Sequence, residues 1–250
     1  MKIFTSTSCR ENAKQRFVDF LMRIDEKEYL HQLQQGHIFM KRVCAYRTLN
    51  SQVPGIADVY EGMAKQEKVD NLTIKMSNGE TLSLIPTGPV RHYYYGFSPI
   101  FCAYHFRLRY SYPCDEIILS FSEDVIHDLA CNRKNPGVIF IDTKFFSERL
   151  KNYAESKKLF WKYGDVMYEN TPENFCWSKD PIDAFFRKDL RYAHQEEWRF
   201  LLSNSKHTTE LIPETETAYE FDVGDISSFA HIDDLNAITK PLPVKINNPI

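Results

Sequence analysis

The segment LTIKMSNGETLSLI, residues 72–85, constrains the fold more than any other part of the chain. Apolar residues alternate with polar ones on both sides of Asn78-Gly79, a dipeptide that suits the positive φ angles of a type I′ turn. The pattern predicts a β-hairpin, which pairs its two strands antiparallel. A hairpin set among other strands and helices is more typical of an α+β fold than of a doubly wound parallel sheet.

The N-terminal part of the chain predicts two helices and two strands. Residues 11–22 are expected to form a first helix, because their aromatic and leucine side chains share one helical face. A short strand ending near Arg23 then leads into a second helix, which Asp25 would cap at its start and Gly36 at its end. Residues 37–46 are expected to form another strand or extended segment.

The later elements are predicted from apolar stretches between turn and capping residues. Asp142 suits the N-cap of a helix that extends to about residue 158, and Asp180-Pro181 suits the start of another that ends near Tyr192. Strands are expected at 100–105, 117–122, 138–141 and 165–168, in EWRFLLS and in AYEFDV, followed by a loose tail.

The length of the chain and its composition favour a single folded domain. The 250 residues are enough for one large core, and no linker-like stretch divides them. Hydrophobic residues make up 43% of the chain and charged residues 26%, values that argue against disorder. We therefore expect one α+β domain over residues 1–250.

The cysteines and the N-terminus predict a cytoplasmic protein. Six cysteines are widely spaced without a C-x-x-C pair, as expected for reduced thiols, and the N-terminus lacks the basic-then-apolar plan of a signal peptide. No run of about 18 apolar residues is present, so we expect no membrane span.

The net charge of −3 excludes a global positive field that would hold nucleic acid by phosphate neutralisation alone. A local basic face could still serve. The candidates are Arg107 with Arg109, and Arg187 with Lys188 and Arg191.

Several common catalytic motifs are absent from the sequence. It contains no G-x-G-x-x-G, G-x-x-x-x-G-K-[ST], G-x-S-x-G or H-E-x-x-H, which argues against Rossmann, P-loop, α/β-hydrolase and zincin enzymes. The nearest pair of metal-ligand type is Cys102 with His105, which would face opposite sides of a strand. We therefore expect no metal site.

The stretch YAHQEEWRFLL places Gln195 and Glu197 two positions apart at the start of a predicted strand. Residues i and i+2 of a strand point the same way, so both would project from the face opposite Trp198. One interpretation is a solvated strand edge, in which Glu197 pairs with a nearby arginine such as Arg199. The other is a catalytic pair.

This stretch resembles the ADP-ribosyltransferase superfamily, in which a Q-x-E or E-x-E motif lies in a loop that enters a late apolar strand. The other family signatures are an Arg or His on an early strand and S-x-S on a middle strand, which Arg23 and Ser120-Phe121-Ser122 match in the same order. YLHQLQQGHIFM, DVYEG and FFRKDLRYAHQEEWRFLL also resemble an uncharacterised bacterial family found beside phage-defence and toxin–antitoxin genes. The resemblance implies a mixed β-sheet core that is split, with flanking helices and the hairpin as an insertion.

The resemblance also implies roles for these residues in the cleavage of NAD, which is a substrate. Glu197 would stabilise the oxocarbenium-like charge that develops on the ribose, and Gln195 would orient the acceptor without charge. Arg23 would hold the diphosphate bidentately. The remaining candidates are Ser120 and Ser122 beside the Glu or the ribose, Tyr46 or one of Tyr93, Tyr94 and Tyr95 against the nicotinamide ring, and Arg47, which could instead form a salt-bridged loop with Asp58 and Glu61.

The function implied is that of a cytoplasmic, NAD-dependent mono-ADP-ribosyltransferase, a toxin-like effector of bacterial phage defence held in check by an antitoxin protein. A Gln at position 195 fits, in the family, acceptors other than arginine, so RNA, DNA and protein all remain open. NAD hydrolysis, with water as the acceptor, is a close variant. The alternative from another class is a non-catalytic sensor or binding module, in which Arg23 and Glu197 would not meet in one cleft.

Overall fold

The computed structural model describes residues 4–5, 14–48, 61–93, 98–112, 116–121, 123–130, 133–170, 175–176, 182–213 and 218–245. Its strands are β1 (Phe4–Thr5), β2 (Lys14–Glu26), β3 (His37–Arg42), β4 (Met63–Glu67), β5 (Leu72–Lys75), β6 (Thr81–Leu84), β7 (Val90–Tyr93), β8 (Pro99–Tyr112), β9 (Glu116–Leu119), β10 (Pro136–Asp142), β11 (Phe160–Asp165), β12 (Met167–Glu169), β13 (Phe175–Cys176), β14 (Arg187–Asp189), β15 (Glu197–Ser203), β16 (Ala218–Asp222), β17 (Ala230–Asp234) and β18 (Leu242–Lys245). Its helices are α1 (Lys27–Gln34), α2 (Val43–Thr48), α3 (Glu123–Ala130) and α4 (Thr143–Ser156), with 3-10 helices η1 (Asp183–Phe186), η2 (Leu190–Gln195) and η3 (Leu235–Ala237).

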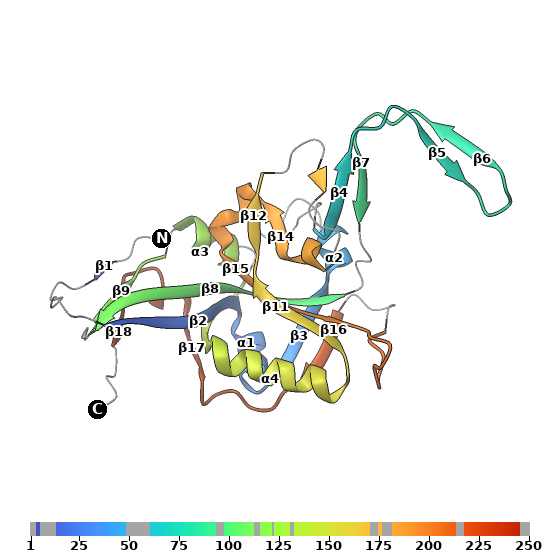
Figure 1. The fold of residues 1–250 in the computed structure, drawn as a ribbon. Helices are drawn as coiled ribbons and strands as arrows, with labels where there is room; N and C mark the ends of the chain where they lie inside the picture. Colours follow the sequence, from blue (N-terminus) through green and yellow to red (C-terminus); the bar gives the residue numbers. More distant parts are fainter. Residues whose placement is uncertain are drawn as a thin grey trace.

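An eight-stranded sheet forms the centre of the fold (Figure 1). Strands β11, β15, β8, β2, β10 and β17 lie side by side in that order, and β3 joins β8 to β16. The expected α+β class is found. The expected mixed sheet is wrong for the described strands, because every pair in this sheet is antiparallel. Parallel neighbours need a crossover that returns beside the first strand, whereas α1 and α4 lead to β3 and β11, which do not neighbour β2 and β10.

Strand β8 changes its neighbour along one edge, and this change opens the sheet. It pairs with β2 as far as Tyr104 opposite Met22, and with β3 only from Ile100 opposite Lys41. Between these points, residues 101–103 have no neighbouring strand on that edge among the described residues, while β15 pairs along the other edge. The fork between β2 and β3, which α1 connects, is therefore a place where a ligand could approach the backbone of β8.

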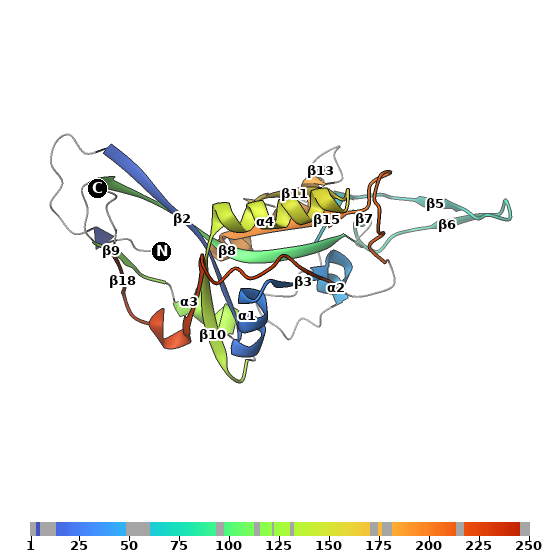
Figure 2. The same cartoon turned by 90° about the horizontal axis from the view of Figure 1, so that it is seen from below.

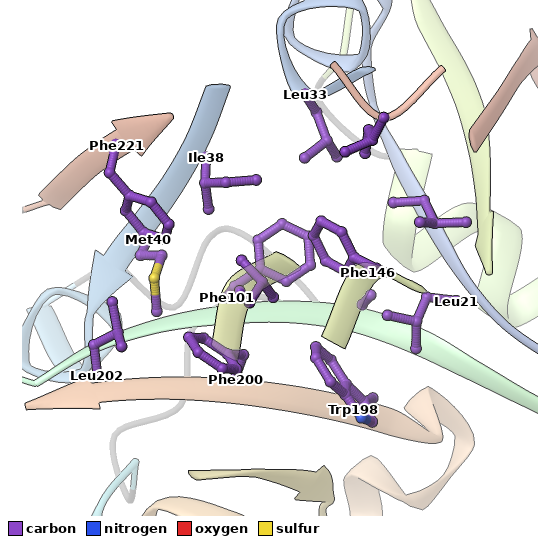
Figure 3. Packing of buried hydrophobic residues seen from close by; sticks show 14 of the residues in the cluster. Leu21, Leu33, Ile38, Met40, Phe101, Phe146, Trp198, Phe200, Leu202 and Phe221 are labelled. Atoms are coloured by element: carbon purple, nitrogen blue, oxygen red, sulfur yellow. The ribbon is translucent and has the colours of Figure 1, made fainter. Parts of the chain in front are cut away.

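The larger hydrophobic core lies between β15, β8 and α4 (Figure 3). Trp198, Phe200 and Leu202 alternate along β15 and all enter this core, as the sequence predicted. Helix α4 begins at the predicted residue, since the Asp142 carboxylate accepts a hydrogen bond from a backbone N–H of the first turn. The helix buries Phe146 completely, and burial of a side chain of this kind stabilises the fold by about 1.5–3 kcal/mol.

Strand β2 corrects the prediction of a helix over residues 11–22. It runs through the middle of the sheet, between β8 and β10, and both of its faces are covered. Leu21 enters the larger core, whereas Met22 and Ile24 enter a second core with Phe106, on the side where α3 lies (Figure 2). A strand buried on both faces has a continuous apolar run, which periodicity alone does not separate from a helix.

The segment after residue 181 corrects the second helix prediction. Instead of one helix ending near Tyr192, η1, β14 and η2 follow one another, and the expected start at Asp180-Pro181 lies outside the described residues. The pairing of β14 with β12 interrupts the helical pattern, so a tertiary contact overrides the local preference. The expected loose tail is also wrong in its described part, because β17 pairs with β10 and β18 pairs with β9.

The predicted hairpin is confirmed as β5 and β6, which extend away from the sheet in both views (Figures 1 and 2). Its turn is not the expected type I′, because Gly79 has a positive φ and Asn78 does not. Helix α1 ends where Gly36 was expected to stop it. Gly36 has a φ of 101°, and a Cβ there would lie 2.2 Å from the carbonyl oxygen of Gly224, so only glycine fits. Among the described residues, no helix combines the length and the apolar character needed to cross a membrane.

Candidate functional site

A cavity of about 630 Å³ opens at the fork in the sheet, within the size range of pockets that hold small molecules and cofactors. Consecutive residues of β2 and of β8 line it, at 22–25 and 100–104, because the two strands separate here. Residues of α1, α2, β3, β14, η2, β15 and β16 also line it, together with Glu61 and Arg133.

The cavity gathers four of the predicted site residues, Arg23, Tyr46, Gln195 and Glu197. They come from β2, α2, η2 and β15, four elements that the fork brings together. Of the predicted Ser120, Ser122 and Arg47, the structure describes the side chain of Ser120 alone. Ser120 follows β9 in a separate three-stranded sheet and is not among the cavity-lining residues, and Ser122 lies outside the described residues. Arg47 belongs to α2, but its side chain is outside the described part.

The turn at Glu196 aims Gln195 and Glu197 into the same cavity. Gln195 ends η2 rather than lying on the strand, which corrects the expected strand geometry. Glu196 adopts a left-handed conformation with φ 38° and ψ 51°, and its carbonyl oxygen accepts a hydrogen bond from the His105 N–H at 2.9 Å. A non-glycine residue in this region carries backbone strain, which proteins often place at functional sites. Trp198 points into the core on the other side.

Glu197 belongs to a buried group of two carboxylates and two cations, here named the cavity cluster: Glu61, Lys188, Glu197 and Arg199. Arg199 Nε lies 2.7 Å from Glu197 Oε1, and Lys188 Nζ lies 2.8 Å from Glu197 Oε2. The Arg199 guanidinium also donates to both carboxylate oxygens of Glu61. The four side chains are between 1% and 9% exposed, so this is a fully buried and charge-balanced network.

The cavity cluster fixes the ionisation of Glu197. Burial alone would raise the pKa of this carboxyl, but Arg199 and Lys188 outweigh burial and hold the pKa well below its usual range. Burial likewise lowers the pKa of Lys188, and Glu197 reverses that effect, so the pKa of Lys188 ends above its usual value. Glu197 is therefore a carboxylate, and Lys188 an ammonium, throughout the neutral range.

The sequence pointed to only part of this cluster. The alternative that pairs Glu197 with Arg199 is confirmed as an ion pair, but the pair is buried rather than solvated. Lys188, expected on a basic surface with Arg187 and Arg191, is instead only 7% exposed and lines the cavity. The i, i+2 spacing of Glu197 and Arg199 was the available signal; nothing local marks Lys188, whose burial depends on the pairing of β14 with β12.

Arg23 lies on a second wall of the cavity and is held by a shared carboxylate. Asp25 Oδ2 accepts from Arg23 Nη2 at 2.9 Å, and Asp25 Oδ1 accepts from Arg133 Nε at 3.2 Å. Burial would raise the pKa of Asp25, but the two guanidinium groups outweigh it and lower the pKa. The group carries a net positive charge, with Arg23 25% exposed, and the Arg23 guanidinium lies 5.0 Å from the centre of the Phe101 ring. Arg133 is a cavity residue that the sequence did not reveal.

Tyr46 lies within electrostatic reach of both charged walls. Burial, reinforced by Cys102, raises the pKa of its hydroxyl well above the usual value, and Arg23 and Glu197 are also among its charged neighbours. The phenol is therefore neutral and offers a flat ring beside the two walls. Of the alternative tyrosines, Tyr93 does not line the cavity, while Tyr94 and Tyr95 lie outside the described residues.

A second ionic group, here named the histidine cluster, crosses β2, β8 and β11 outside the cavity: Asp19, His105, Arg107 and Asp165. His105 Nε2 lies 2.8 Å from Asp19 Oδ1, and its Nδ1 contacts Asp165. Burial lowers the pKa of His105, but its hydrogen bonds to Asp165 and Asp19 outweigh burial and raise the pKa. None of these four residues lines the cavity.

The cavity offers fixed charges and a neutral ring, but no arrangement of metal ligands. Within the described part of the chain, no three or more His, Cys, Asp or Glu side chains are grouped to hold a metal ion. The chemistry that this arrangement can support is binding of a charged organic molecule, with an anionic part at Arg23 and a developing positive charge at Glu197.

Comparisons with known protein families, with curated proteins and with solved structures found no match.

Proposed function

We propose that this chain is a NAD-consuming enzyme with an ADP-ribosyltransferase-like split sheet, which transfers ADP-ribose to a macromolecule. The observation that carries the proposal is the convergence of Arg23, Tyr46, Gln195 and Glu197 on one cavity. The alternative of a non-catalytic module predicted that Arg23 and Glu197 would not share a cleft, and both line this cavity.

The charges in the cavity match the two ends of the reacting part of NAD. The positive group around Arg23 and Arg133 suits the diphosphate, because a guanidinium donates two parallel hydrogen bonds to phosphate oxygens. The carboxylate of Glu197 suits the ribose that carries nicotinamide, and the ring of Tyr46 suits stacking against the nicotinamide. In this arrangement, Ser120 has no role at the ribose.

The reaction follows from these positions. The bond between ribose C1′ and the nicotinamide nitrogen breaks, and its electron pair leaves with neutral nicotinamide. Positive, oxocarbenium-like charge develops on the ribose, and the ionised Glu197 stabilises this charge. An acceptor atom beside Gln195 then forms the new bond to C1′ and releases its proton to solvent. With water as the acceptor, the same steps are NAD hydrolysis.

The acceptor proposed is RNA, DNA or protein, and the setting is a toxin-like effector of phage defence in the cytoplasm, restrained by an antitoxin protein. An amide at position 195 cannot remove a proton, so it favours acceptor atoms that attack before they lose one, such as amide or nucleobase nitrogens. The arginines near Lys188 add little to an approach for nucleic acid, because Arg187 is only 17% exposed and pairs with Glu169, and Arg191 pairs with Asp189.

One observation favours a second candidate, a nucleotide-binding module without catalysis. Lys188 and Arg199 already contact both carboxylate oxygens of Glu197, and such a balanced buried network also occurs in purely structural roles. In that case the cavity would bind NAD or ADP-ribose without cleaving it.

Labelled NAD separates these candidates. Purified protein is incubated with NAD carrying the label on its adenylate part, together with cell lysate, which is then divided into protein, RNA and DNA fractions. Label that enters one fraction with the wild-type protein and not with Glu197→Gln supports transfer and identifies the acceptor class. Release of nicotinamide without labelled macromolecule indicates hydrolysis, and binding without release indicates the non-catalytic module.

A further inference from the structure

Lys188 contacts both members of the Gln195–Glu197 pair. Its ammonium lies 2.8 Å from Glu197 Oε2 and 3.0 Å from Gln195 Oε1. It also lies 3.9 Å from Glu61 Oε2 and 5.4 Å from the centre of the Tyr192 ring. The side chain is 7% exposed and borders the cavity, so these contacts form inside the site.

The position of Lys188 depends on the short strand β14. Arg187–Asp189 pairs with Met167–Glu169 of β12, and Arg187 and Asp189 flank Lys188 on a segment whose central residue is buried. Because alternate residues of a strand face opposite sides, the pairing turns Lys188 inward between two more exposed neighbours. Helix η2 follows at once and ends at Gln195, so the lysine and the glutamine belong to one compact segment.

The ammonium decides how the amide of Gln195 is oriented. A protonated lysine has three donors and no acceptor, so it can contact the oxygen of the amide but not its nitrogen. With Gln195 Oε1 held at Lys188, the Gln195 NH₂ group points away from the ammonium. The same ammonium holds the Glu197 carboxylate, so one side chain sets the relative placement of the two groups.

We infer that Lys188 is a positioning residue, which holds the Gln195 amide nitrogen and the Glu197 carboxylate in the arrangement that transfer of ADP-ribose requires. This inference rests on the proposed function. Lys188 touches neither NAD nor the acceptor in this account; it acts through Gln195 on the acceptor and through Glu197 on the ribose. Its loss should therefore affect the reaction steps more than the binding of NAD.

The test compares Lys188→Met, which keeps the length of the side chain and removes its charge and donors, with Lys188→Arg, which keeps both. The matched control is Lys162→Met, since Lys162 also pairs with a carboxylate, Asp183 at 2.7 Å, but does not line the cavity. Three quantities are measured for each variant: kcat and KM for nicotinamide release, the ratio of ADP-ribose transfer to hydrolysis, and the ¹⁵N–¹H signals of the Gln195 side-chain amide in the ligand-free protein.

For Lys188→Met we expect kcat to fall about 100-fold, as for other displaced reacting groups, while KM for NAD changes by less than about 3-fold. In Lys188→Met the transfer-to-hydrolysis ratio should also fall and the Gln195 amide signals should shift. Lys188→Arg should recover part of kcat and part of the transfer-to-hydrolysis ratio. In Gln195→Leu protein, Lys188→Met should leave the transfer-to-hydrolysis ratio unchanged, because its effect on the acceptor passes through Gln195.

Unshifted Gln195 signals in folded Lys188→Met would overturn the inference whether or not the protein cleaves NAD. If the wild-type protein is active, the inference is also overturned when Lys188→Met leaves both kcat and the transfer-to-hydrolysis ratio unchanged. It is overturned as well when Lys162→Met lowers them as much as Lys188→Met does. If Lys188→Met does not fold, the signals and kinetics of Lys188→Arg decide, since an arginine shifts both contacts without removing the charge. If the wild-type protein releases no nicotinamide, the proposed function is wrong. The Gln195 amide signals still shift in Lys188→Met in that case, so this outcome differs from failure of the inference about Lys188.

Discussion

The cavity cluster and the histidine cluster both involve the central sheet, the first through β15 and the second through β2, β8 and β11, yet they differ in exposure and in chemistry. The cavity cluster of Glu61, Lys188, Glu197 and Arg199 is almost completely buried and contains no histidine. In the histidine cluster, Arg107 is 60% exposed and Asp19 and Asp165 are 43% and 44% exposed, around a His105 side chain that is 4% exposed. The cavity cluster lines the cavity of about 630 Å³ at the fork, and the histidine cluster does not.

The largest expected difference between the clusters is in stability. Arg199→Met leaves Glu61 and Glu197 buried with a single cation, and loss of one partner from a buried pair costs about 3–5 kcal/mol. Arg107→Met removes an exposed partner and should cost at most about 1 kcal/mol. Urea denaturation of both variants measures the free energy of unfolding. Equal losses would contradict the distinction drawn between the clusters.

A smaller effect is expected on ligand affinity from the cavity wall around Arg23. Arg23→Gln removes the charge proposed to hold the diphosphate, and charged hydrogen bonds contribute about 1.5–3 kcal/mol, so ADP-ribose should bind about 10- to 100-fold more weakly. Calorimetric titration with ADP-ribose measures this change and does not depend on cleavage. Arg149→Gln is the control, since Arg149 contacts the Val223 carbonyl oxygen away from the cavity. If Arg23→Gln binds ADP-ribose as tightly as the wild-type protein, the proposal that the diphosphate binds at Arg23 is wrong.

The smallest effect is a pH dependence of stability just above neutrality, which, of the two clusters, we expect from the histidine cluster. The folded pKa of His105 is raised above its usual 6.5, so the stability it contributes is complete below that value and is lost as pH rises through the folded pKa. The pKa values of Asp19 and Asp165 are lowered, so their contribution is lost as pH falls through the acidic range. Urea denaturation between pH 5 and pH 9, at roughly unit steps, should show stability falling on the alkaline side.

His105→Gln should remove the part of that decline that lies closest to neutrality, because a glutamine does not titrate in this range. Stability of the wild-type protein that rises with pH above neutrality would contradict the assignment. Nicotinamide release should not follow the His105 titration, because Glu197 stays ionised across the same interval.

Local patterns in the sequence predicted the elements whose stability is local. The hairpin at Asn78-Gly79, apart from its turn type, the helix that Asp142 caps and the alternating strand that carries Trp198 are found as expected. Strand β2 and the segment around Lys188 were predicted wrongly, because their conformation depends on strands distant in the sequence. The periodicity of apolar residues reports only on residues close in the sequence. It does not show which distant strands will pair with a segment or cover its faces.

The candidate site divides in the same way. Gln195 and Glu197 were found from their spacing, and Arg23 from its position before α1, and all three line the cavity. Arg133 was not found, and Lys188 was predicted only as part of a basic surface, because each reaches the cavity through the packing of a short segment. The sequence indicates which side chains carry suitable chemistry, whereas the fork between β2 and β3 decides which of them meet.

The most direct test of this account is the release of nicotinamide from NAD by the wild-type protein, by Glu197→Gln and by Asp165→Asn. The two substitutions neutralise one carboxylate in each ionic cluster, and both remove an ion pair with a neighbouring cation. We expect release by the wild-type protein, a loss of at least about 100-fold in Glu197→Gln and nearly unchanged release by folded Asp165→Asn. Equal rates in Glu197→Gln and the wild-type protein, or no release by any of the three, would contradict the claim that this cavity cleaves NAD.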